Sequence, residues 1–380
     1  MVLDRKGELR KMKKLLTVVG ARPQFIKAGI LSKKLEGEFD EVLLHTGQHY
    51  DANMSEVFFD ELGIKEAKYN LNVGSTSHAK QTALMMMGIE KVIDQEAPDG
   101  VLIYGDTNST VAASLTASKM LIPVFHVEGG IRTHCLDMPE EQNRIIADHL
   151  SSMVFVSTVD NLREAEREGL GTRSYLVGDI MFDSLIFYSK IVGEQGKDHY
   201  FQRLKGILSQ RTEPIDDYYL ATIHRPENTD NQMNFFEILR ALNQLEHPVI
   251  LSTHPRIRDK VLSIGRDFVN IYFVEPLSYL ESIFFSKQAN MVVTDSGGLH
   301  KEAYLHGTPC VTILRSGWME TVKGGWNQFV PPLSNEIVLA VNEREIDRTV
   351  ERDDFGDGNA CAKIVELMKM FFGHTSMHLY

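Results

Sequence analysis

The sequence predicts an α/β protein with two doubly wound domains. Short apolar segments rich in β-branched residues alternate with helical patterns along the whole chain, and several of these segments are continuously apolar. Continuous apolar runs are typical of parallel strands that are covered on both faces, and repeated strand–helix units specify an open parallel sheet. About ten strand segments exceed what one sheet comfortably holds. We therefore expect two sheets rather than one.

The elements follow one another in a regular order. Strands are predicted at 15–20, 41–47, 100–106, 123–129, 153–158, 218–224, 248–254, 270–276, 290–296 and 310–315, and helices at 24–36, 77–95, 108–119, 140–150, 160–168, 232–244 and 298–306. A polar stretch at 186–217 separates the two strand series. It divides the chain into a first domain, 1–185, and a second, 186–362, with a helix at about 363–380 packing back on the first.

Composition excludes several functional classes. The 380 residues carry 40 basic and 52 acidic side chains, a net charge of −12, which argues against nucleic acid or an anionic membrane as partner. Three scattered cysteines indicate neither a disulfide framework nor a structural zinc site. The apolar run after the charged N-terminus is too short for a signal or membrane segment, so we expect a cytoplasmic protein.

Polar residues gather where the predicted strands end. Ligands of open α/β sheets bind beyond the carboxyl ends of the strands, so we expect the site in a cleft between the two domains. One candidate is TDSGGLHKEA, where Ser296, Gly297 and Gly298 would present backbone N–H groups to an anion at a helix start, and Glu302 could accept ribose hydroxyls. The alternative is a glycine-rich turn that binds nothing.

Basic residues and histidines stand near the same strand ends. Arg22 and Lys27 follow the first strand and could meet a diphosphate, although surface cations are usually only solvated. His224 and Arg225 follow the strand at 218–224 and are expected at the mouth of the cleft. Neither a dinucleotide-binding glycine pattern nor a histidine pair with metal spacing is present in the sequence, so we predict no cofactor and no metal.

Acidic residues supply the most specific signal. Asp106 and Glu128 end neighbouring strands, and Glu140 and Glu141 open a helix. We expect these carboxylates to converge, so that repulsion and burial raise the pKa of at least one toward neutrality, as suits a general acid/base pair. The alternative is helix caps and solvated helix starts, the role assigned to Glu141.

Together these motifs resemble a known family. GARPQFIK, TGQH, GDTNST, HVEGGIRT, MPEEQNR, HRPEN, THPR and TDSGGLHKEA have the order and spacing of the non-hydrolysing UDP-N-acetylglucosamine 2-epimerases over roughly residues 13–330, and GDGNACAKIVELM is similar to the family's closing helix. The resemblance implies a GT-B fold of two Rossmann-like domains with a UDP-sugar in the cleft. It also implies a homodimer.

The resemblance implies inversion at carbon 2 of the sugar, for the synthesis of cell-surface polysaccharide precursors. UDP would leave, a glycal with a double bond between carbons 1 and 2 would form, and UDP would return after protonation on the opposite face. Asp106, Glu128 and Glu140 match the acid/base carboxylates, and His224 matches a histidine near the diphosphate. The implied UDP-sugar contacts are Arg22, Lys27, Arg144, His224, Arg225, Ser296, Gly297, Gly298, Glu302 and Arg315.

Two segments depart from the family pattern. The loop RSGWMETVKGGWN has Trp318 where the family commonly has an arginine, and resembles a subgroup that includes epimerases for UDP-diacetamido-uronic acids. Gln48-His49-Tyr50-Asp51 departs from the stretch that binds an activating UDP-GlcNAc, so allostery is not assumed. A GT-B glycosyltransferase, a hydrolysing relative that releases free N-acetylmannosamine and a binding module remain as alternatives.

Overall fold

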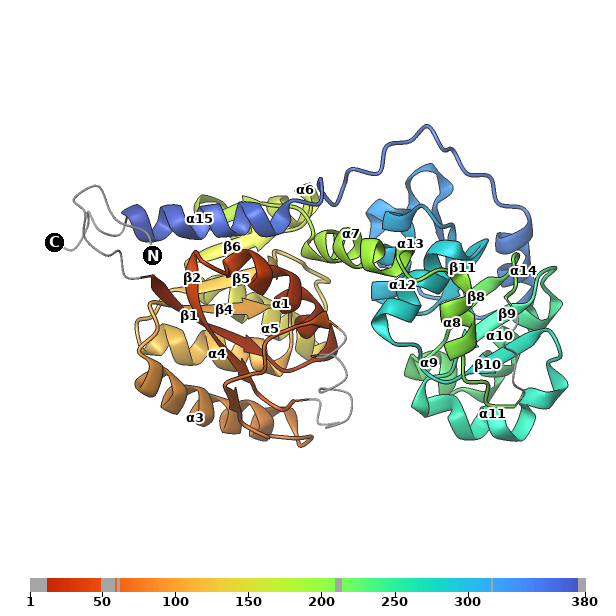
Figure 1. Ribbon diagram of the computed structural model, residues 1–380, viewed down its shortest axis with the longest axis horizontal. Helices are drawn as coiled ribbons and strands as arrows, with labels where there is room; N and C mark the ends of the chain where they lie inside the picture. The colour runs from red at the N-terminus through yellow and green to blue at the C-terminus, as the bar shows by residue number, and fades with distance from the viewer. Residues whose placement is uncertain (1–11, 49–58, 60–61, 209–213, 316, 375–380) are drawn as a thin grey trace. The chain divides into compact units, whose positions relative to one another are not determined.

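The computed structural model describes residues 12–48, 59, 62–208, 214–315 and 317–374, which fall into two compact units (Figure 1). The first unit comprises Met1–Ser184 with Asp354–Tyr380, and the second comprises Leu185–Asp353. Each unit contains one parallel sheet with helices on both faces. The prediction of an α/β protein with two doubly wound sheets is confirmed.

The first unit has seven parallel strands in the order β3-β2-β1-β4-β5-β6-β7. Their bounds are β1 Lys13–Val19, β2 Phe39–His45, β3 Tyr69–Asn70, β4 Gly100–Tyr104, β5 Val124–Gly129, β6 Met153–Val156 and β7 Ser174–Leu176. The central strands β1, β4, β5 and β6 consist almost entirely of buried residues, as parallel strands between two helical layers require.

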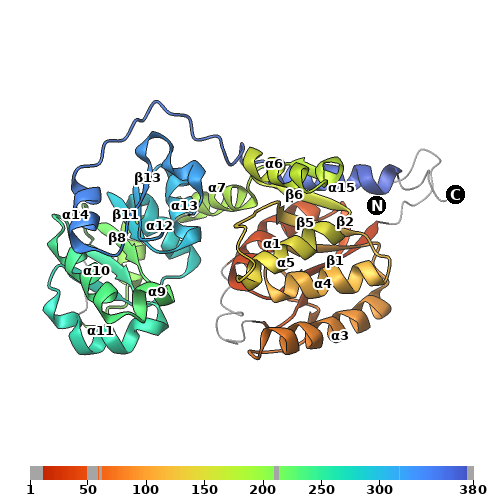
Figure 2. The same ribbon diagram turned by 180° about the vertical axis from the view of Figure 1, so that it is seen from behind.

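Helices cover both faces of this sheet. They are α1 Arg22–Leu35, α3 His78–Glu96, α4 Asn108–Lys119, α5 Pro139–Leu150, α6 Val159–Arg167 and α15 Ala360–His374. The division between the two units falls within a further helix, α7 Ile180–Gly193. Neighbouring helices α3, α4 and α5 pack on one face, and Figure 2 shows them side by side. Helix α15 packs beside α1, and its Phe371 and Phe372 rings meet Phe125 of β5 at centroid distances of 5.2 and 5.5 Å.

The second unit has six parallel strands in the order β10-β9-β8-β11-β12-β13. They are β8 Tyr219–Thr222, β9 Val249–Ser252, β10 Ile271–Val274, β11 Met291–Thr294, β12 Cys310–Thr312 and β13 Asn327–Phe329. The helices are α8 Lys197–Arg203, α9 Pro226–Thr229, α10 Gln232–Gln244, α11 Arg258–Ile264, α12 Tyr279–Gln288, α13 Gly297–His306 and α14 Ser334–Asn342. One continuous apolar core joins the sheet to α10, α11 and α14.

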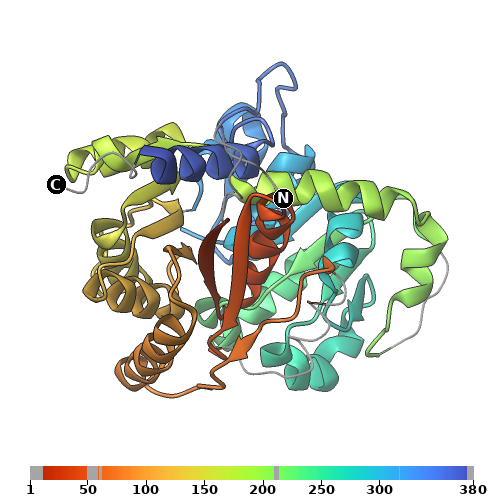
Figure 3. The same ribbon diagram turned by 60° about the vertical axis from the view of Figure 1, so that its left-hand side comes forward.

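Three strands and one connection differ from the prediction. All ten predicted strands are present, but β3, β7 and β13 were missed because two or three residues carry no periodic pattern. The polar stretch 186–217 was expected to separate the domains, yet it contains the end of α7 and all of α8 (Figure 3). Apolar residues within this polar stretch explain the difference: Tyr188, Tyr200 and Phe201 are almost fully buried.

The segment 354–362 was assigned to the second domain, but its contacts lie in the first unit. The Asp183 carboxylate accepts hydrogen bonds from the backbone N–H groups of Ala360 (3.0 Å) and Cys361 (2.8 Å), at the start of α15. The Phe355 carbonyl accepts one from the Asp179 N–H (2.8 Å). In the described part of the chain, none of the helices combines the length and apolar content needed to cross a membrane.

Candidate active site

The strand order of each sheet marks where a ligand is expected. Chain order reverses between β1 and β4 in the first sheet and between β8 and β11 in the second. Ligands of doubly wound sheets bind at such switch points, beyond the carboxyl ends of the strands. Arg22 and Asp106 follow the two strands of the first switch point, and His224 and Ser296 follow those of the second. The predicted residues therefore lie where this topology places ligands.

The glycine turn, residues 295–298, joins β11 to α13. Ser296 is the N-cap, and its side chain accepts a hydrogen bond from the Leu299 N–H at 3.3 Å. Neither Gly297 nor Gly298 has a positive φ. A methyl group on them would come no closer than 3.7 Å to any described atom. Packing among the described residues therefore does not require glycine at either position. The Ser296 N–H, expected to face an anion, instead donates to Thr294 Oγ1 at 3.0 Å.

His224 and Arg225 are held over this turn by Asp295. The fully buried Asp295 carboxylate accepts from the N–H groups of both residues at 2.9 Å and from Asn228 Nδ2 at 3.1 Å. Burial alone would raise the pKa of Asp295, but its bonds to His224, Arg225 and Asn228 outweigh burial and lower it. A Gly297 methyl group would lie 3.7 Å from the Arg225 guanidinium, so this cation lies beside the helix start.

His224 also has a defined orientation. Its Nδ1 lies 3.2 Å from Asp295 Oδ1, and 38% of its side chain is exposed. Because a carboxylate only accepts, Nδ1 carries the proton of this contact, which leaves Nε2 for a ligand. Asp295 thus brings His224 and Arg225 together beside the glycine turn.

Two other predicted residues lie further from the turn. Glu302 is buried in α13, one turn inside the helix. Its neighbour Lys301 is also buried, with Nζ 4.4 Å from the centre of the Trp318 ring. Arg315 is exposed in the loop that follows β12. Trp318, the residue that departs from the family pattern, therefore packs against the helix that carries the glycine turn.

Asp106 is fixed by the start of α5. Its Oδ2 accepts from Arg144 Nε (3.0 Å) and from the second guanidinium nitrogen (2.6 Å). The same guanidinium donates to Glu141 at 2.9 Å. Glu141 accepts the N–H groups of Thr133 and His134 at 2.9 and 2.8 Å and is almost fully buried. Glu141 is therefore a buried loop anchor, and its assignment to a solvated helix start is wrong.

Glu128 stands on a β-bulge at the end of β5. The register between β5 and β6 shifts between Val127 and Gly129, and Glu128 has φ +66°, a left-handed conformation that is rare for residues other than glycine. Its carboxylate forms an ion pair with the buried Lys27 ammonium group. A methyl group on Gly105 would lie 3.5 Å from Glu128 Oε2, so this carboxylate lies beside the residue that precedes Asp106.

Glu128 and Asp106 lie at the carboxyl ends of neighbouring strands, but neither is an unpaired charge. We expected mutual repulsion, whereas Glu128 has Lys27 and Asp106 has Arg144 as a counter-ion. Lys27, expected near a diphosphate, contacts Glu128 instead. Glu140 is exposed in the first turn of α5, next to the buried Glu141.

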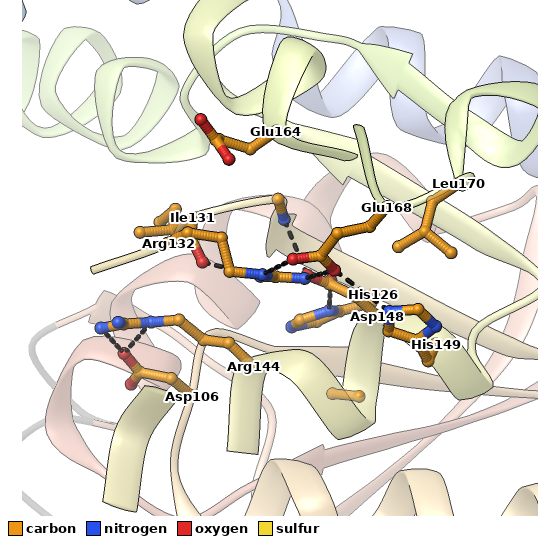
Figure 4. A network of polar contacts seen from close by, with 12 residues as sticks. Asp106, His126, Ile131, Arg132, Arg144, Asp148, His149, Glu164, Glu168 and Leu170 are labelled. Carbon is orange, nitrogen blue, oxygen red and sulfur yellow. Dashed lines mark hydrogen bonds and ion pairs between the residues drawn. The ribbon is translucent and has the colours of Figure 1, made fainter. Parts of the chain in front are cut away.

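A buried polar network that the sequence did not predict joins β5 to α5 (Figure 4). His126 and Asp148 are fully buried and lie 2.7 Å apart, from Nδ1 to Oδ1. Arg132 joins Asp148 to Glu168 through contacts of 2.7 Å. The one available signal was a histidine inside the otherwise apolar strand VFHVEG; its pairing with an aspartate on α5 depends on the fold.

The predicted site residues therefore fall into two sets. Arg22 at the start of α1, Lys27, Asp106, Glu128, Glu140 and Arg144 belong to the first unit, and His224, Arg225, Ser296, Gly297, Gly298, Glu302 and Arg315 belong to the second. Among the described residues, no group of three or more His, Cys, Asp or Glu side chains has the arrangement of a metal site.

Comparisons with known proteins match this chain over nearly its whole length. The family model for UDP-N-acetylglucosamine 2-epimerase matches residues 33–369. A UDP-N-acetylglucosamine 2-epimerase homolog of Methanococcus maripaludis is 40% identical, covering 94% of this chain and 99% of that protein. The UDP-2,3-diacetamido-2,3-dideoxy-D-glucuronate 2-epimerase of Pseudomonas aeruginosa is 39% identical, covering 93% and 99%. The crystal structure of Methanocaldococcus jannaschii UDP-GlcNAc 2-epimerase in complex with UDP-GlcNAc and UDP is similar, with a TM-score of 0.82 at 34% identity, covering 94% and 99%.

Proposed function

Because this chain belongs to the UDP-N-acetylglucosamine 2-epimerase family, a family of isomerases, we propose that it interconverts UDP-GlcNAc and UDP-ManNAc by inverting carbon 2 of the sugar. The observation that carries this proposal is the paired chemistry of the two switch points. One presents two carboxylates with their counter-ions, and the other presents a helix start, a histidine and an arginine.

The chemistry of the sugar dictates the route. The hydrogen on carbon 2 is not beside a carbonyl group, so a carboxylate cannot simply remove it. Breaking the anomeric C–O bond first releases UDP and develops positive charge on the ring, which makes this hydrogen acidic. Its removal gives a glycal with a double bond between carbons 1 and 2. Protonation from the opposite face and return of UDP complete the inversion, so atoms and charge balance.

The second set of residues suits the departing UDP. Negative charge grows on the diphosphate as the bond breaks, and the N–H groups of Gly297 and Gly298 with the Arg225 guanidinium would stabilise it there. His224 Nε2, oriented by Asp295, would assist the leaving group. Glu302 would hold the ribose, and Arg22 and Arg315 remain proposed contacts of the UDP-sugar.

The first set suits the proton transfers. Glu128 and Asp106 would serve as the acid/base pair on opposite faces of carbon 2, with Glu140 as a third candidate. Lys27 stabilises the carboxylate form of Glu128, which a proton acceptor needs, and Arg144 fixes the direction of the Asp106 carboxylate. In this reading Lys27 and Arg144 act on the carboxylates rather than on UDP.

A second substrate is supported by two observations. The Pseudomonas aeruginosa relative, named for a UDP-diacetamido-uronate, is nearly as similar as the first relative, at 39% against 40% identity. Trp318, which stands where the family commonly has an arginine, packs on Lys301. A 2-epimerase of such a UDP-uronic acid would use the same carboxylates and the same elimination. A glycosyltransferase, another alternative, would instead need an acceptor molecule for the sugar.

Assembly, location and regulation complete the proposal. We propose a homodimer, as the resemblance implies, to be tested by light scattering on the purified protein. We also propose the cytoplasm, where nucleotide sugars are precursors for polysaccharides and where Cys135, Cys310 and Cys361 would stay reduced. His49–Asp51, part of the stretch considered for an activator, lies outside the described residues.

One experiment tests the function directly. The protein is incubated in D2O with UDP-GlcNAc, and in parallel with the UDP-diacetamido-glucuronate, and the sugars are followed by NMR. Deuterium at carbon 2 of both UDP-linked epimers supports the epimerase and identifies its sugar. Free N-acetylmannosamine without a UDP-linked epimer would indicate hydrolysis, and failure to exchange either sugar would contradict the proposal.

A further inference from the structure

Glu128 has a backbone conformation that its own sequence does not favour. It is a glutamate at φ +66°, on the bulge where the β5–β6 register shifts. Residues other than glycine hold such conformations only where the surrounding structure enforces them, and such sites are often functional. Contacts around Glu128 must therefore hold its backbone in this conformation.

Asp148 contacts the backbone that follows Glu128. Its Oδ2 accepts the Gly130 N–H at 3.0 Å and an Arg132 guanidinium N–H at 2.7 Å, while its Oδ1 faces His126 Nδ1 at 2.7 Å. A methyl group on Gly129 would lie 2.4 Å from Asp148 Oδ1, so the bulge fits against this carboxylate with no room for a side chain.

His126 contacts the backbone that precedes Asp106. Its Nε2 lies 2.7 Å from the Gly105 carbonyl oxygen, and its Nδ1 lies against Asp148. The His126 ring therefore bridges the Gly105 carbonyl oxygen and the Asp148 carboxylate. An unbroken chain of contacts therefore runs from Gly105 through His126 and Asp148 to Gly130. Figure 4 shows its central pair, His126 and Asp148. Its two ends flank the two carboxylates proposed to react.

The burial of the polar groups in this chain of contacts indicates that it does more than stabilise the fold. His126 and Asp148 are both fully buried. Buried ion pairs are weak sources of stability, because desolvation offsets the attraction and apolar replacements are often as stable. Such a pair is better explained by the geometry it imposes. Burial alone would raise the pKa of Asp148, but His126 and Arg132 outweigh it and hold the pKa below its ordinary value.

We propose that His126 and Asp148 are positioning residues, which set the distance and direction between the Asp106 and Glu128 carboxylates. The inference rests on the proposed function, because it assumes that these two carboxylates transfer the protons. Neither positioning residue touches the sugar in this scheme. They act through the backbone at Gly105 and Gly130, whose positions determine where the two acidic side chains begin.

The first test replaces one acceptor of the chain. Asp148→Asn keeps the shape but cannot accept from His126, Gly130 and Arg132 together. Misplacing a reacting group by about 1 Å costs about 100-fold in rate, so we expect kcat for carbon-2 exchange to fall about 100-fold, with KM and UDP affinity within about threefold of the unaltered protein. The matched control is Glu168→Gln, which alters Arg132's other partner and touches neither the bulge nor His126.

A second variant keeps every charge and covers the case in which Asp148→Asn does not fold. Gly129→Ala places a methyl group 2.4 Å from Asp148 Oδ1 and Val154 Cγ1, so it displaces the bulge. We expect it to lower kcat as Asp148→Asn does. Its control is Gly193→Ala, at the end of α7, where a methyl group meets nothing within 4 Å among the described residues.

The outcomes separate the two proposals. Assays use whichever of the two UDP-sugars the unaltered protein turns over, and rates are compared at equal folded fraction. A loss of kcat in Asp148→Asn or Gly129→Ala that exceeds the loss in its control by about tenfold or more supports positioning. Equal losses in variant and control, or a change in KM alone, would overturn it. If Glu128→Gln retains full exchange, the assignment of Glu128 to proton transfer fails, whereas the proposed function itself fails only if the unaltered protein exchanges neither sugar.

Discussion

Two buried aspartates perform the same task in the two units. Asp148 accepts the N–H of Gly130 behind Glu128, and Asp295 accepts the N–H groups of His224 and Arg225. Each thereby fixes a turn that carries a proposed functional side chain. A buried carboxylate with several N–H donors is costly to replace, because any neutral substitute leaves donors without a partner. Rigid placement of the reacting groups therefore originates in residues that need not touch the substrate.

The acid/base pair yields a prediction about single side chains. General acid/base catalysis contributes about 100- to 10,000-fold, so Glu128→Gln and Asp106→Asn should each lower carbon-2 exchange by about 1,000-fold. UDP affinity, measured by calorimetry, should stay within about threefold, because both residues belong to the sugar end of the scheme. Loss of UDP binding in both variants would instead make these carboxylates structural.

Acid stability follows from the lowered pKa values of Asp148 and Asp295. An aspartate in the unfolded chain has a pKa of about 3.9. Around and below that pH, the unfolded chain therefore binds more protons than the folded one. Their stabilisation is complete above this value and is lost as pH falls through the lower folded pKa values. Urea unfolding from pH 7 to pH 3 should show this decline, with a shallower slope in Asp148→Asn. An unchanged slope would contradict the assignment.

The start of α13 combines an N-cap with two glycines that packing among the described residues does not require. Ser296 caps the helix, and the positions of Gly297 and Gly298 have room for a methyl group. Glycine in a helix costs about 0.5–1 kcal/mol relative to alanine. Neither φ nor packing demands this cost, which supports our proposal that a diphosphate approaches the backbone closely here.

Gly297→Ala separates stability from binding at this helix. The variant should unfold at an equal or higher free energy, by up to about 1 kcal/mol, because alanine is the better helix former. UDP affinity should fall by about tenfold or more, since the methyl group takes the place of the diphosphate. Calorimetric titration and urea unfolding measure the two quantities. Unchanged UDP affinity would show that the anion does not bind at this turn.

Helix α15 returns to the first unit from the far end of the chain. Ile364 is fully buried, whereas Met370 is 56% exposed on the same helix. Removing a buried isoleucine side chain costs about 2–5 kcal/mol, and surface changes cost about 0.5 kcal/mol or less. Ile364→Ala should therefore lower the free energy of unfolding by at least about 2 kcal/mol, with Met370→Ala as its control. Equal effects would mean that α15 does not stabilise the unit.

For the molecule as a whole, the sequence was informative where structure is periodic or local. Continuous apolar runs predicted ten strands, and the positions of these strands showed that polar residues follow their carboxyl ends. Short strands such as β13 lacked a readable pattern, and the largely apolar helix α7 was not predicted. Glu141 was predicted to lie at an ordinary solvated helix start. Its hydrogen-bond donors, the N–H groups of Thr133 and His134, belong to a loop that folds over it, which the sequence does not reveal.

Contacts between distant residues were beyond sequence reasoning. The His126–Asp148 pair joins a strand to a helix across 22 positions, and the Lys27–Glu128 pair spans 101. Neither spacing has a local meaning, because each depends on which strands become neighbours. The placement of Asp106 and Glu128 at the ends of neighbouring strands could be predicted, whereas the cations that neutralise them could be found only in the folded chain.

Cleavage of the anomeric C–O bond can be observed directly. A UDP-sugar that carries oxygen-18 in the bridge between carbon 1 and the β-phosphorus is incubated with the protein, and recovered UDP-sugar is examined by phosphorus NMR. If UDP departs, rotation of the freed β-phosphate moves the label into non-bridging positions at a rate comparable with carbon-2 exchange, and we expect this scrambling. Deuterium exchange at carbon 2 with the label still confined to the bridge would contradict the elimination route.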